Sequence, residues 1–396
     1  MSSRSTLAFL KTETGSGLLL AVAALFAIAW ANSPWADIYD ALTHTVVPVR
    51  LGPFAEEMTA SAWVKTALMP IFFFVVGLEI KHEILRGELS NPRRLALPVL
   101  AAAGGVAIPA LVYLAINASA GRHLEGWPIP TATDIAFALA ALAAAGKRLP
   151  PSLRVFLMTL AIADDLVAVA LIAALYTEHL RLPMLAGAAA VTAVLAVMGR
   201  WRTAPYALWI LGGLLLWGFT LKSGVNTSLA GVAAAFCLPL EPKRPGGPGV
   251  LDQTMAALHP YVAFVILPLF AFTAAGFAVG GPDSGKVILS SVGLGVAAGL
   301  FLGKQLGVFG AALLVISLKW ARRPTGAKWI ELYGVSALCG VGFTMSLYIG
   351  ALAFPGAEPL HQAQVRAGVV MGSLASMLLG VGLLSWSDQR RGREDA

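Results

Sequence analysis

The sequence is poor in charge and nearly free of cysteine. Asp, Glu, Lys and Arg make up only 12% of its 396 residues, against roughly 25% in soluble domains. The two cysteines, Cys237 and Cys339, lie far apart in apolar segments and give neither a disulfide framework nor the ligand spacing of a metal site. Glycine and proline follow no repeat, which excludes collagen-like and low-complexity chains. Because 58% of the residues are apolar and the mean hydropathy is +0.77, we also exclude a soluble enzyme, a disordered chain and a nucleic-acid-binding module.

Long apolar runs occupy most of the chain. A helix needs about 20 apolar residues to cross a bilayer, and the sequence predicts twelve such spans: Gly17–Trp30, Trp63–Leu78, Leu95–Ile116, Trp127–Ala145, Leu153–Tyr176, Met184–Met198, Ala204–Leu221, Gly224–Leu240, Tyr261–Val279, Val287–Leu318, Ile330–Phe354 and Val365–Leu384. No small-residue cleavage site follows the first run, so we expect a retained helix rather than a signal peptide. The spans leave no stretch for a separate soluble domain, and the predicted class is therefore an all-α membrane protein.

Basic residues are distributed unevenly between the two sides of these spans. Loops on the side of the N-terminus hold 20 of the 28 Lys and Arg residues, and loops on the other side hold six. The remaining two, Lys65 and Lys304, fall inside spans. Because loops rich in Lys and Arg stay in the cytoplasm, this division predicts twelve helices with both termini cytoplasmic.

Four charged side chains fall near the middle of predicted spans. Asp164 and Asp165 lie at the centre of the fifth span, Asp134 near the centre of the fourth, and Lys304 near that of the tenth. A charge at this depth costs at least about 2.5–3.5 kcal/mol on insertion scales. A buried ion pair that holds the helices together is one interpretation. An ion pair alone would leave a net negative charge, because one amine cannot balance two adjacent carboxylates. The unbalanced charge favours a functional site.

The adjacent aspartates have the chemistry of an exchange site. Asp164 and Asp165 point about 100° apart on a helix but remain close enough to interact. Like charge and burial both favour the protonated form, so we expect the pair to exchange protons near physiological pH as a coupled unit. Hard oxygen ligands also suit small cations. One site can then hold either protons or a cation, and Lys304 can pair with a carboxylate when no cation is bound.

The fourth span begins with residues that interrupt a helix. In G-W-P-I-P-T-A-T-D-I-A-F-A (126–138), Pro128 and Pro130 remove backbone donors. Thr133 or Asp134 can cap the helix that follows. Asp134 would then face the positive end of a half-helix.

A second interruption lies in the eleventh span. The run L-C-G-V-G-F-T-M (338–345) places Gly340 and Gly342 at mid-depth, near the candidate site. Irregular backbone is tolerated there only where protein or a cavity covers it. Each interruption alone is ordinary, because Pro and Gly are common in membrane helices. Interruptions seven spans apart predict that spans 3–5 and 10–12 form an inverted repeat, the arrangement of many transporter sites.

Five segments resemble those of a known family: V-G-L-E-I-K-H-E-I-L-R-G-E-L (76–89), T-A-T-D-I-A-F-A-L (131–139), F-L-M-T-L-A-I-A-D-D-L (156–166), G-K-Q-L-G (303–307) and C-G-V-G-F-T-M-S (339–346). In this order, over nearly the whole chain, the sequence resembles the NhaA sodium/proton antiporters. The resemblance implies electrogenic, pH-regulated exchange of Na+ or Li+ for a larger number of protons across the bacterial inner membrane. It implies no enzymatic reaction and no cofactor.

The resemblance also assigns roles to the buried residues. Asp164 and Asp165 match the pair that binds the cation and the protons, so the transported Na+ is the metal expected there. Asp134 and Lys304 match the charges that balance two discontinuous helices crossing at mid-membrane. Lys304 also matches the amine that pairs with the first aspartate, and Thr133 matches a threonine beside the site.

A second group of residues matches the cytoplasmic face linked to pH activation: Glu79, Lys81, His82, Glu83 and Asp252. A solvated helix end explains Glu79, His82 and Glu83 more simply. His82 stands where the family often has Arg, and Asn226 stands where it often has His. Because a neutral amide does not titrate, pH control through position 226 is in doubt for this chain.

The resemblance further implies the organisation of the chain. We expect a single transmembrane antiporter domain over 1–396: spans 1–2 with an extracellular hairpin (1–94), core repeat 3–5 (95–176), spans 6–9 (177–286), and core repeat 10–12 with a cytoplasmic tail (287–396). The segment 44–57 contains the strand-like T-V-V-P-V-R-L-G. It resembles the family's dimer hairpin, so a homodimer in a lipid bilayer is expected.

Three other functions use buried charges of this kind. An intramembrane aspartyl protease needs two aspartates from different helices, which Asp134 and Asp164 could supply, although no G-x-G-D motif is present. A retinal-type pump could use Lys304 as a Schiff base, but twelve spans rather than seven argue against it. A channel would not couple opposite fluxes of Na+ and protons.

Overall fold

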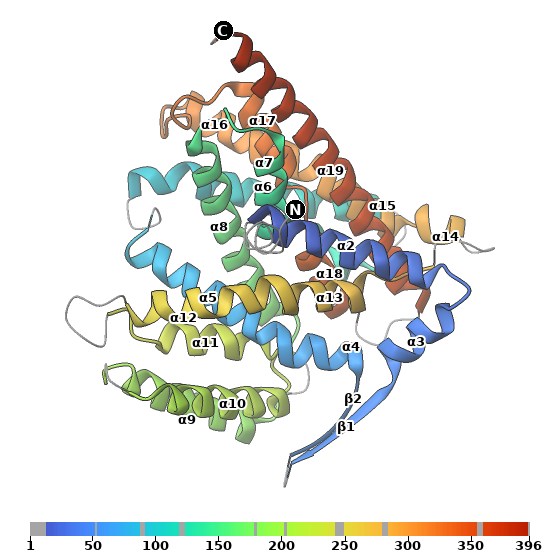
Figure 1. The fold of residues 1–396 in the computed structure, drawn as a ribbon, viewed down its shortest axis with the longest axis vertical. Coiled ribbons are helices and arrows are strands. Elements are labelled where there is room, and N and C mark those ends of the chain that lie inside the picture. Colours follow the sequence, from blue (N-terminus) through green and yellow to red (C-terminus); the bar gives the residue numbers. More distant parts are fainter. Residues whose placement is uncertain are drawn as a thin grey trace, which may run out of the picture. The chain divides into compact units, whose positions relative to one another are not determined.

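The structure, a computed structural model, is predominantly helical with one short β-hairpin (Figure 1). It describes residues 13–51, 54–87, 92–118, 123–177, 180–201, 204–241, 249–278, 284–354 and 359–394. The chain forms two compact units. The first comprises Met1–Asp37, Asn91–Ala168 and Ala274–Ala396, and the second comprises Ile38–Ser90 and Val169–Thr273.

The first unit holds the candidate site and consists mainly of helices. Its α-helices are α2 (Glu13–Ala31), α6 (Pro92–Ala118), α7 (Ile135–Ala145), most of α8 (Pro151–Leu175), α14 (Ser284–Ile288), α15 (Ser291–Ala298), α16 (Gly310–Ser317), α17 (Trp329–Leu338), α18 (Phe343–Ala353) and α19 (Pro359–Glu394). Two 3-10 turns, η3 (Leu124–Gly126) and η4 (Ile129–Thr131), precede α7. Two π-helical turns, η6 (Gly299–Gly303) and η7 (Gln305–Phe309), join α15 to α16.

Small and branched apolar residues pack these helices together. One buried cluster draws on α6, α7, α8, η7, α16, α17 and α19, and includes Leu97, Ala138, Ala141, Leu157, Ala163, Val308, Ala312, Leu332 and Leu384. Between membrane helices the association depends on close packing, because lipid tails are as apolar as the side chains. The many alanines therefore let the helices approach closely around the charged residues.

The second unit carries the hairpin and a separate set of helices. It contains most of α3 (Ala36–His44), β1 (Val46–Leu51), β2 (Phe54–Thr59), α4 (Ala60–Trp63), η1 (Val64–Leu68), α5 (Met69–Leu85), α9 (Leu182–Met198), α10 (Tyr206–Ser223), α11 (Ser228–Cys237), α12 (Val250–Tyr261), η5 (Val262–Ile266) and most of α13 (Leu267–Ala275). Helices α9 and α10 lie side by side (Figure 1).

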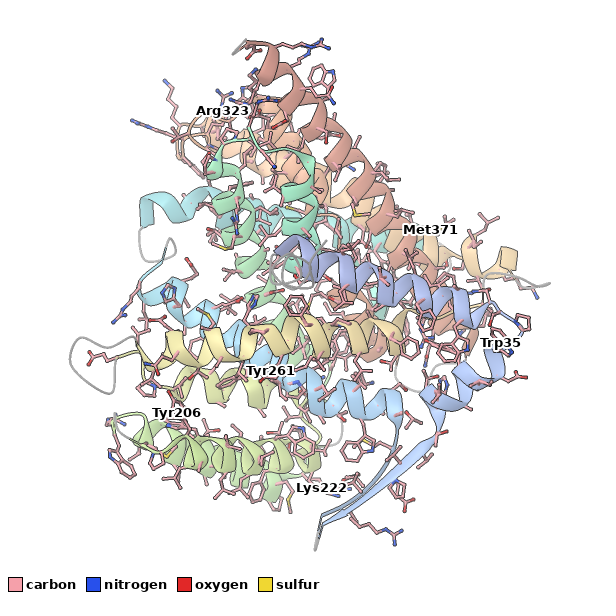
Figure 2. All side chains as sticks on the ribbon, in the orientation of Figure 1. Trp35, Tyr206, Lys222, Tyr261, Arg323 and Met371 are labelled. Atoms are coloured by element: carbon pink, nitrogen blue, oxygen red, sulfur yellow. The ribbon has the colours of Figure 1, made fainter. Side chains whose placement is uncertain are left out.

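The expected strand-like segment is part of an antiparallel hairpin. Val46 pairs with Thr59 and Leu51 with Phe54, while residues 52–53 at the turn lie outside the described residues. Lys222 at the end of α10 forms an ion pair with Glu56 and donates to the carbonyl of Ala55 at 3.1 Å (Figure 2). The hairpin is thereby attached to α10 within the second unit.

The number of spans in the described residues is smaller than predicted. Seven helices are long and apolar enough to cross a membrane: Ala60–Leu85, Ala96–Ala118, Pro151–Leu175, Tyr206–Ser223, Val250–Ala275, Ser291–Ser317 and Leu360–Glu394. Three sharply bent helix pairs raise the number to as many as ten. Two further apolar helices, Leu182–Met198 and Ser228–Cys237, are shorter. A predominantly helical fold with candidate membrane spans is confirmed, whereas the count of twelve, the inverted repeat and the crossing of the discontinuous helices stay predictions.

Two predicted spans are shorter than expected for local reasons. The tenth begins at Ser291 rather than Val287, because the Ser290 hydroxyl caps the helix by accepting from Gly293 N at 3.0 Å. The eighth is reduced to α11. Gly224 before it has the left-handed φ of 84°, and the backbone becomes extended at Leu238.

Candidate functional site

The first interruption lies where the sequence predicts it. The turns η3 and η4 carry Pro128 and Pro130, and the backbone then becomes extended before α7 starts. The two parts meet at an angle of 41°. Asp134 is the N-cap of α7, and its Oδ1 accepts from Phe137 N at 3.1 Å. The negative side chain therefore sits at the positive end of a half-helix, where it is most stable.

The second interruption separates α17 from α18 by a bend of 42°. Gly340 and Gly342 lie in the gap between them. A Cβ atom on Gly340 would lie 2.3 Å from the carbonyl oxygen of Leu300, and one on Gly342 would lie 3.0 Å from that of Ala132. Only glycine fits such close approaches of backbone to backbone.

The two interruptions are joined by hydrogen bonds across the unit. The backbone N of Asp134 donates to the carbonyl of Val341 at 2.7 Å, and the Ser346 hydroxyl donates to that of Ile129 at 2.8 Å. Asp134 Oδ2 accepts from Thr344 N at 3.1 Å and from the Thr344 hydroxyl. One buried carboxylate thus caps the starts of both α7 and α18.

A hydroxyl, a carboxylate and an amine meet next to this junction. Lys304 Nζ lies 2.5 Å from Asp164 Oδ2, and both side chains are 0% exposed. The Thr133 hydroxyl lies 2.8 Å from the same oxygen and 2.8 Å from the carbonyl oxygen of Cys339. Since a hydroxyl has one hydrogen, Thr133 donates to one of these oxygens at a time. Asp165, the next residue of α8, is 1% exposed.

The two oxygens of the Asp164 carboxylate have different surroundings. Its Oδ2 accepts both side-chain hydrogen bonds, whereas its Oδ1 has no hydrogen-bond partner among the described residues. A buried carboxylate oxygen normally has a partner. Asp164, the Thr133 hydroxyl and the Cys339 carbonyl thus offer oxygen atoms of the kind that coordinate Na+ at unwound helices.

Lys304 lies in an unusual stretch of backbone. It is the residue between the π-helical turns η6 and η7. Single π-helical turns inside α-helices often occur at functional sites. The sequence around Lys304 carries no proline, so local signals did not predict these turns.

The residues that resemble the pH-linked face lie in the second unit. Lys81 Nζ donates to the carbonyls of Phe236 and Leu238 at 2.7 and 2.5 Å and so closes the end of α11. His82 Nε2 lies 3.8 Å from Asp252 Oδ1.

The rest of this group and Asn226 lie on the same unit. Glu79 and Glu83 are half-buried on α5, and His82 Nδ1 lies 4.0 Å from Glu83 Oε1. Asn226 Oδ1 accepts from Ser228 N at 2.9 Å at the start of α11, so its amide has a local structural role. A regulatory role for the group remains a prediction.

Sequence reasoning missed one buried acid. Glu331 on α17 is 0% exposed and bound by Arg391 of α19, with Nε 2.6 Å from Oε1 and Nη2 2.9 Å from Oε2. Glu331 lies three residues after Lys328, the N-cap of α17, but lysine is not a usual N-cap residue, so no local signal in the sequence marked it. The backbone N of Lys328 does donate to Glu331 at 2.7 Å.

Comparison with known proteins gives a consistent result over nearly the whole chain. The family described as Na+/H+ antiporter 1 matches residues 7–384. The Na(+)/H(+) antiporter NhaA 2 of Pseudomonas savastanoi pv. phaseolicola is 48% identical over 386 residues, which cover 96% of this chain and 96% of that protein. NhaA of Caulobacter vibrioides is 47% identical over 384 residues, covering 96% of this chain and 90% of its own. NhaA 1 of Syntrophotalea carbinolica is 45% identical over 383 residues, covering 97% and 96%. The chain therefore belongs to the NhaA family of Na+/H+ antiporters, which are membrane transporters.

Proposed function

We propose that this protein exports Na+ or Li+ from the cytoplasm in exchange for a larger number of protons, by alternating access at Asp164 and Asp165. The observation that carries the proposal is the buried contact of Lys304 and Thr133 with one oxygen of Asp164. It supplies a carboxylate with movable partners, next to a second buried carboxylate.

Competition between protons and a cation for the same two carboxylates gives the exchange. Protons occupy Asp164 and Asp165 until Na+ enters from the cytoplasm, binds both carboxylates and displaces them. Lys304 pairs with Asp164 when that carboxylate carries neither a proton nor a cation. Two protons leave for one cation, which moves net charge and lets the membrane potential drive export.

Asp134 has a positioning role in this proposal. Both of its oxygens are occupied by the starts of α7 and α18, so it compensates the two helix ends and does not bind the transported ion. Thr133 is the residue before Asp134, so a shift of α7 or α18 moves the Thr133 hydroxyl that binds Asp164. This coupling is a route by which the site opens first to one side of the membrane and then to the other.

Further parts of the proposal concern the whole chain in its membrane. We infer twelve spans in the bacterial inner membrane, both termini in the cytoplasm, an inverted repeat of spans 3–5 and 10–12, and a homodimer formed through the hairpin 44–57. We also propose pH regulation through the group Glu79, Lys81, His82, Glu83 and Asp252.

The geometry argues against the alternative functions. An aspartyl protease needs two carboxylates that share one water, but both oxygens of Asp134 bind helix starts. A Schiff base needs a free amine, whereas Lys304 is paired with Asp164.

Everted vesicles with an imposed pH gradient test the proposal. Additions of Na+ or Li+ should release the gradient, K+ should not, and Asp165→Asn should abolish the response because the site then lacks one of the two carboxylates that bind the cation and carry the protons. Asp37→Asn is the matched control, since Asp37 is exposed on α3. Undiminished Na+-dependent proton flux in Asp165→Asn would reject the dyad as the site.

A further inference from the structure

The last turns of α19 bind the start of α17 through a partly buried ion pair. Arg391 binds both oxygens of Glu331, at 2.6 and 2.9 Å, and its Nη2 also donates to the carbonyl of Gly326 at 2.6 Å. The Ser387 hydroxyl, one turn earlier on α19, donates to Glu331 Oε1 at 2.8 Å. A two-pronged guanidinium–carboxylate contact fixes orientation as well as distance. The start of α17 is therefore held rigidly against α19.

Two residues further along, α17 contacts the stretch that carries Lys304. The Tyr333 hydroxyl donates to Gln305 Oε1 at 2.7 Å, and Gln305 is the residue after Lys304. The Gln305 amide in turn donates to the carbonyl of Phe301 at 2.5 Å, across the π-helical turns. Tyr333 also packs edge-on against Phe309, with ring centroids 5.1 Å apart.

The other end of α17 meets the candidate site directly. The carbonyl of Cys339 receives the Thr133 hydroxyl, and the carbonyl of Val341 receives the backbone N of Asp134. The segment 333–341 thus contacts the surroundings of Asp164 at two places: Tyr333 binds Gln305, the residue after Lys304, and the Cys339 carbonyl receives the Thr133 hydroxyl.

The same segment of α19 also holds the connection that follows α7. Asp388 Oδ1 accepts from the backbone N of Arg148 at 2.6 Å, and Asp388 Oδ2 lies 3.8 Å from the Arg148 guanidinium. The half-helices α7 and α17 are therefore both anchored to α19 at the ends that point away from the interruptions.

We propose that Arg391 and Glu331 are a positioning pair: by fixing α17 on α19, they set how Thr133 and Lys304 face Asp164 and thereby set the affinity for the transported cation. The inference rests on the proposed function. Neither residue touches the ion. Their effect passes through α17, a rigid element with contacts at both ends.

Apparent KM for Na+ and maximal rate, measured separately in everted vesicles, test the pair. Arg391→Gln removes the guanidinium that contacts both oxygens of Glu331 and leaves this buried carboxylate without a positively charged partner. We expect apparent KM to rise about twofold to thirtyfold, the range for residues that act through packed neighbours, while the maximal rate per folded molecule changes less. Arg393→Gln is the matched control, because Arg393 lies two residues along the same helix and is exposed.

A second variant covers the case in which Arg391→Gln fails to fold. Tyr333→Phe removes only the hydroxyl that binds Gln305 and keeps the ring packing, so it should raise apparent KM in the same direction. Arg391→Lys should rescue only part of the affinity, since an ammonium cannot contact both carboxylate oxygens in the same way.

The outcomes separate this inference from the proposed function. If the wild-type protein shows no Na+-dependent proton flux, the proposed function is wrong. If the wild type exchanges and Asp165→Asn does not, but folded Arg391→Gln and Tyr333→Phe both keep the wild-type apparent KM, the positioning pair is wrong. A fall in maximal rate alone, with apparent KM unchanged, also contradicts it, because that result indicates a purely structural role.

Discussion

Buried carboxylates in the first unit differ in the mobility of their partners. Asp134 is held by backbone N–H groups of Phe137 and Thr344, which belong to helix starts and cannot leave without unfolding them. Asp164 is held by the side chains of Lys304 and Thr133, which can rotate away. Only the second kind of carboxylate can exchange its partners for a cation. This difference is the reason for our proposal that Asp134 is structural and Asp164 takes part in transport.

Thr133 provides a test at this scale. Thr133→Val removes the hydroxyl between Asp164 and the Cys339 carbonyl while it keeps the shape of the side chain. In the proposed function the Thr133 hydroxyl oxygen is a ligand of the bound Na+, and an interaction with a charged group is worth about 1.5–3 kcal/mol, so its loss should raise apparent KM for Na+ roughly tenfold or more. Thr133→Ser should stay near the wild type.

Thr220→Val is the matched control for this prediction. Thr220 is also buried, but its hydroxyl donates to the Leu216 carbonyl of its own helix α10. Equal apparent KM values in Thr133→Val and the wild type would remove Thr133 from the site.

The interrupted helices create the site because each exposes backbone groups that a continuous helix would use internally. The carbonyls of Cys339 and Val341 are available to Thr133 and Asp134 only because α17 stops at Leu338. In an apolar interior such groups must find partners. The partners come from the other interrupted helix, so the exposed backbone groups of each interruption form hydrogen bonds with residues of the other.

Gly340 tests the close packing at this junction. Gly340→Ala would place a Cβ atom 2.3 Å from the Leu300 carbonyl oxygen and 2.3 Å from Ser376 Oγ. Relief of this overlap requires a backbone shift, so the thermal unfolding midpoint in detergent should fall and Na+ exchange should weaken. Overpacking of this kind typically costs about 1–3 kcal/mol.

Gly382→Ala on α19 is the control, because nothing lies within 4 Å of the added Cβ. Alanine is favoured over glycine in a helix by about 1 kcal/mol, so the unfolding midpoint should stay or rise. If both variants unfold at the wild-type temperature, the close approach at Gly340 does not constrain the fold.

The sequence predicted those features of the elements that have local causes. Pro128, Pro130, Gly340 and Gly342 mark the interruptions, and they were found because proline and glycine change the backbone at their own positions. The π-helical turns around Lys304 contain Gly299, Gly303 and Gly307 but no proline, and they were missed because glycine alone is common in membrane helices.

At the scale of the whole molecule, the missed features are contacts between distant segments. Glu331 and Arg391 are 60 residues apart, and Asp134 and Thr344 are 210 apart. The pattern of apolar residues along the sequence does not predict such pairs, because they depend on how the helices pack. The burial of Asp134, Asp164, Asp165 and Lys304 was predictable, since each lies at the centre of an apolar run.

Division of the chain into two compact units is the other feature that the sequence did not predict. The first unit contains both interrupted helices and all four buried charges of the candidate site, and the second contains the hairpin and the group that resembles the pH-linked face. The candidate site is therefore built entirely from residues of one unit.

Competition between protons and Na+ at one site is tested most directly by the apparent KM for Na+ as a function of pH in everted vesicles. As pH falls, protons reoccupy the site and apparent KM should rise. At pH values where the site is mostly protonated, the rise is about tenfold per pH unit for each proton that the cation displaces. Arg393→Gln should follow the wild-type curve. An apparent KM that stays constant while the exchange rate changes with pH would contradict a shared site.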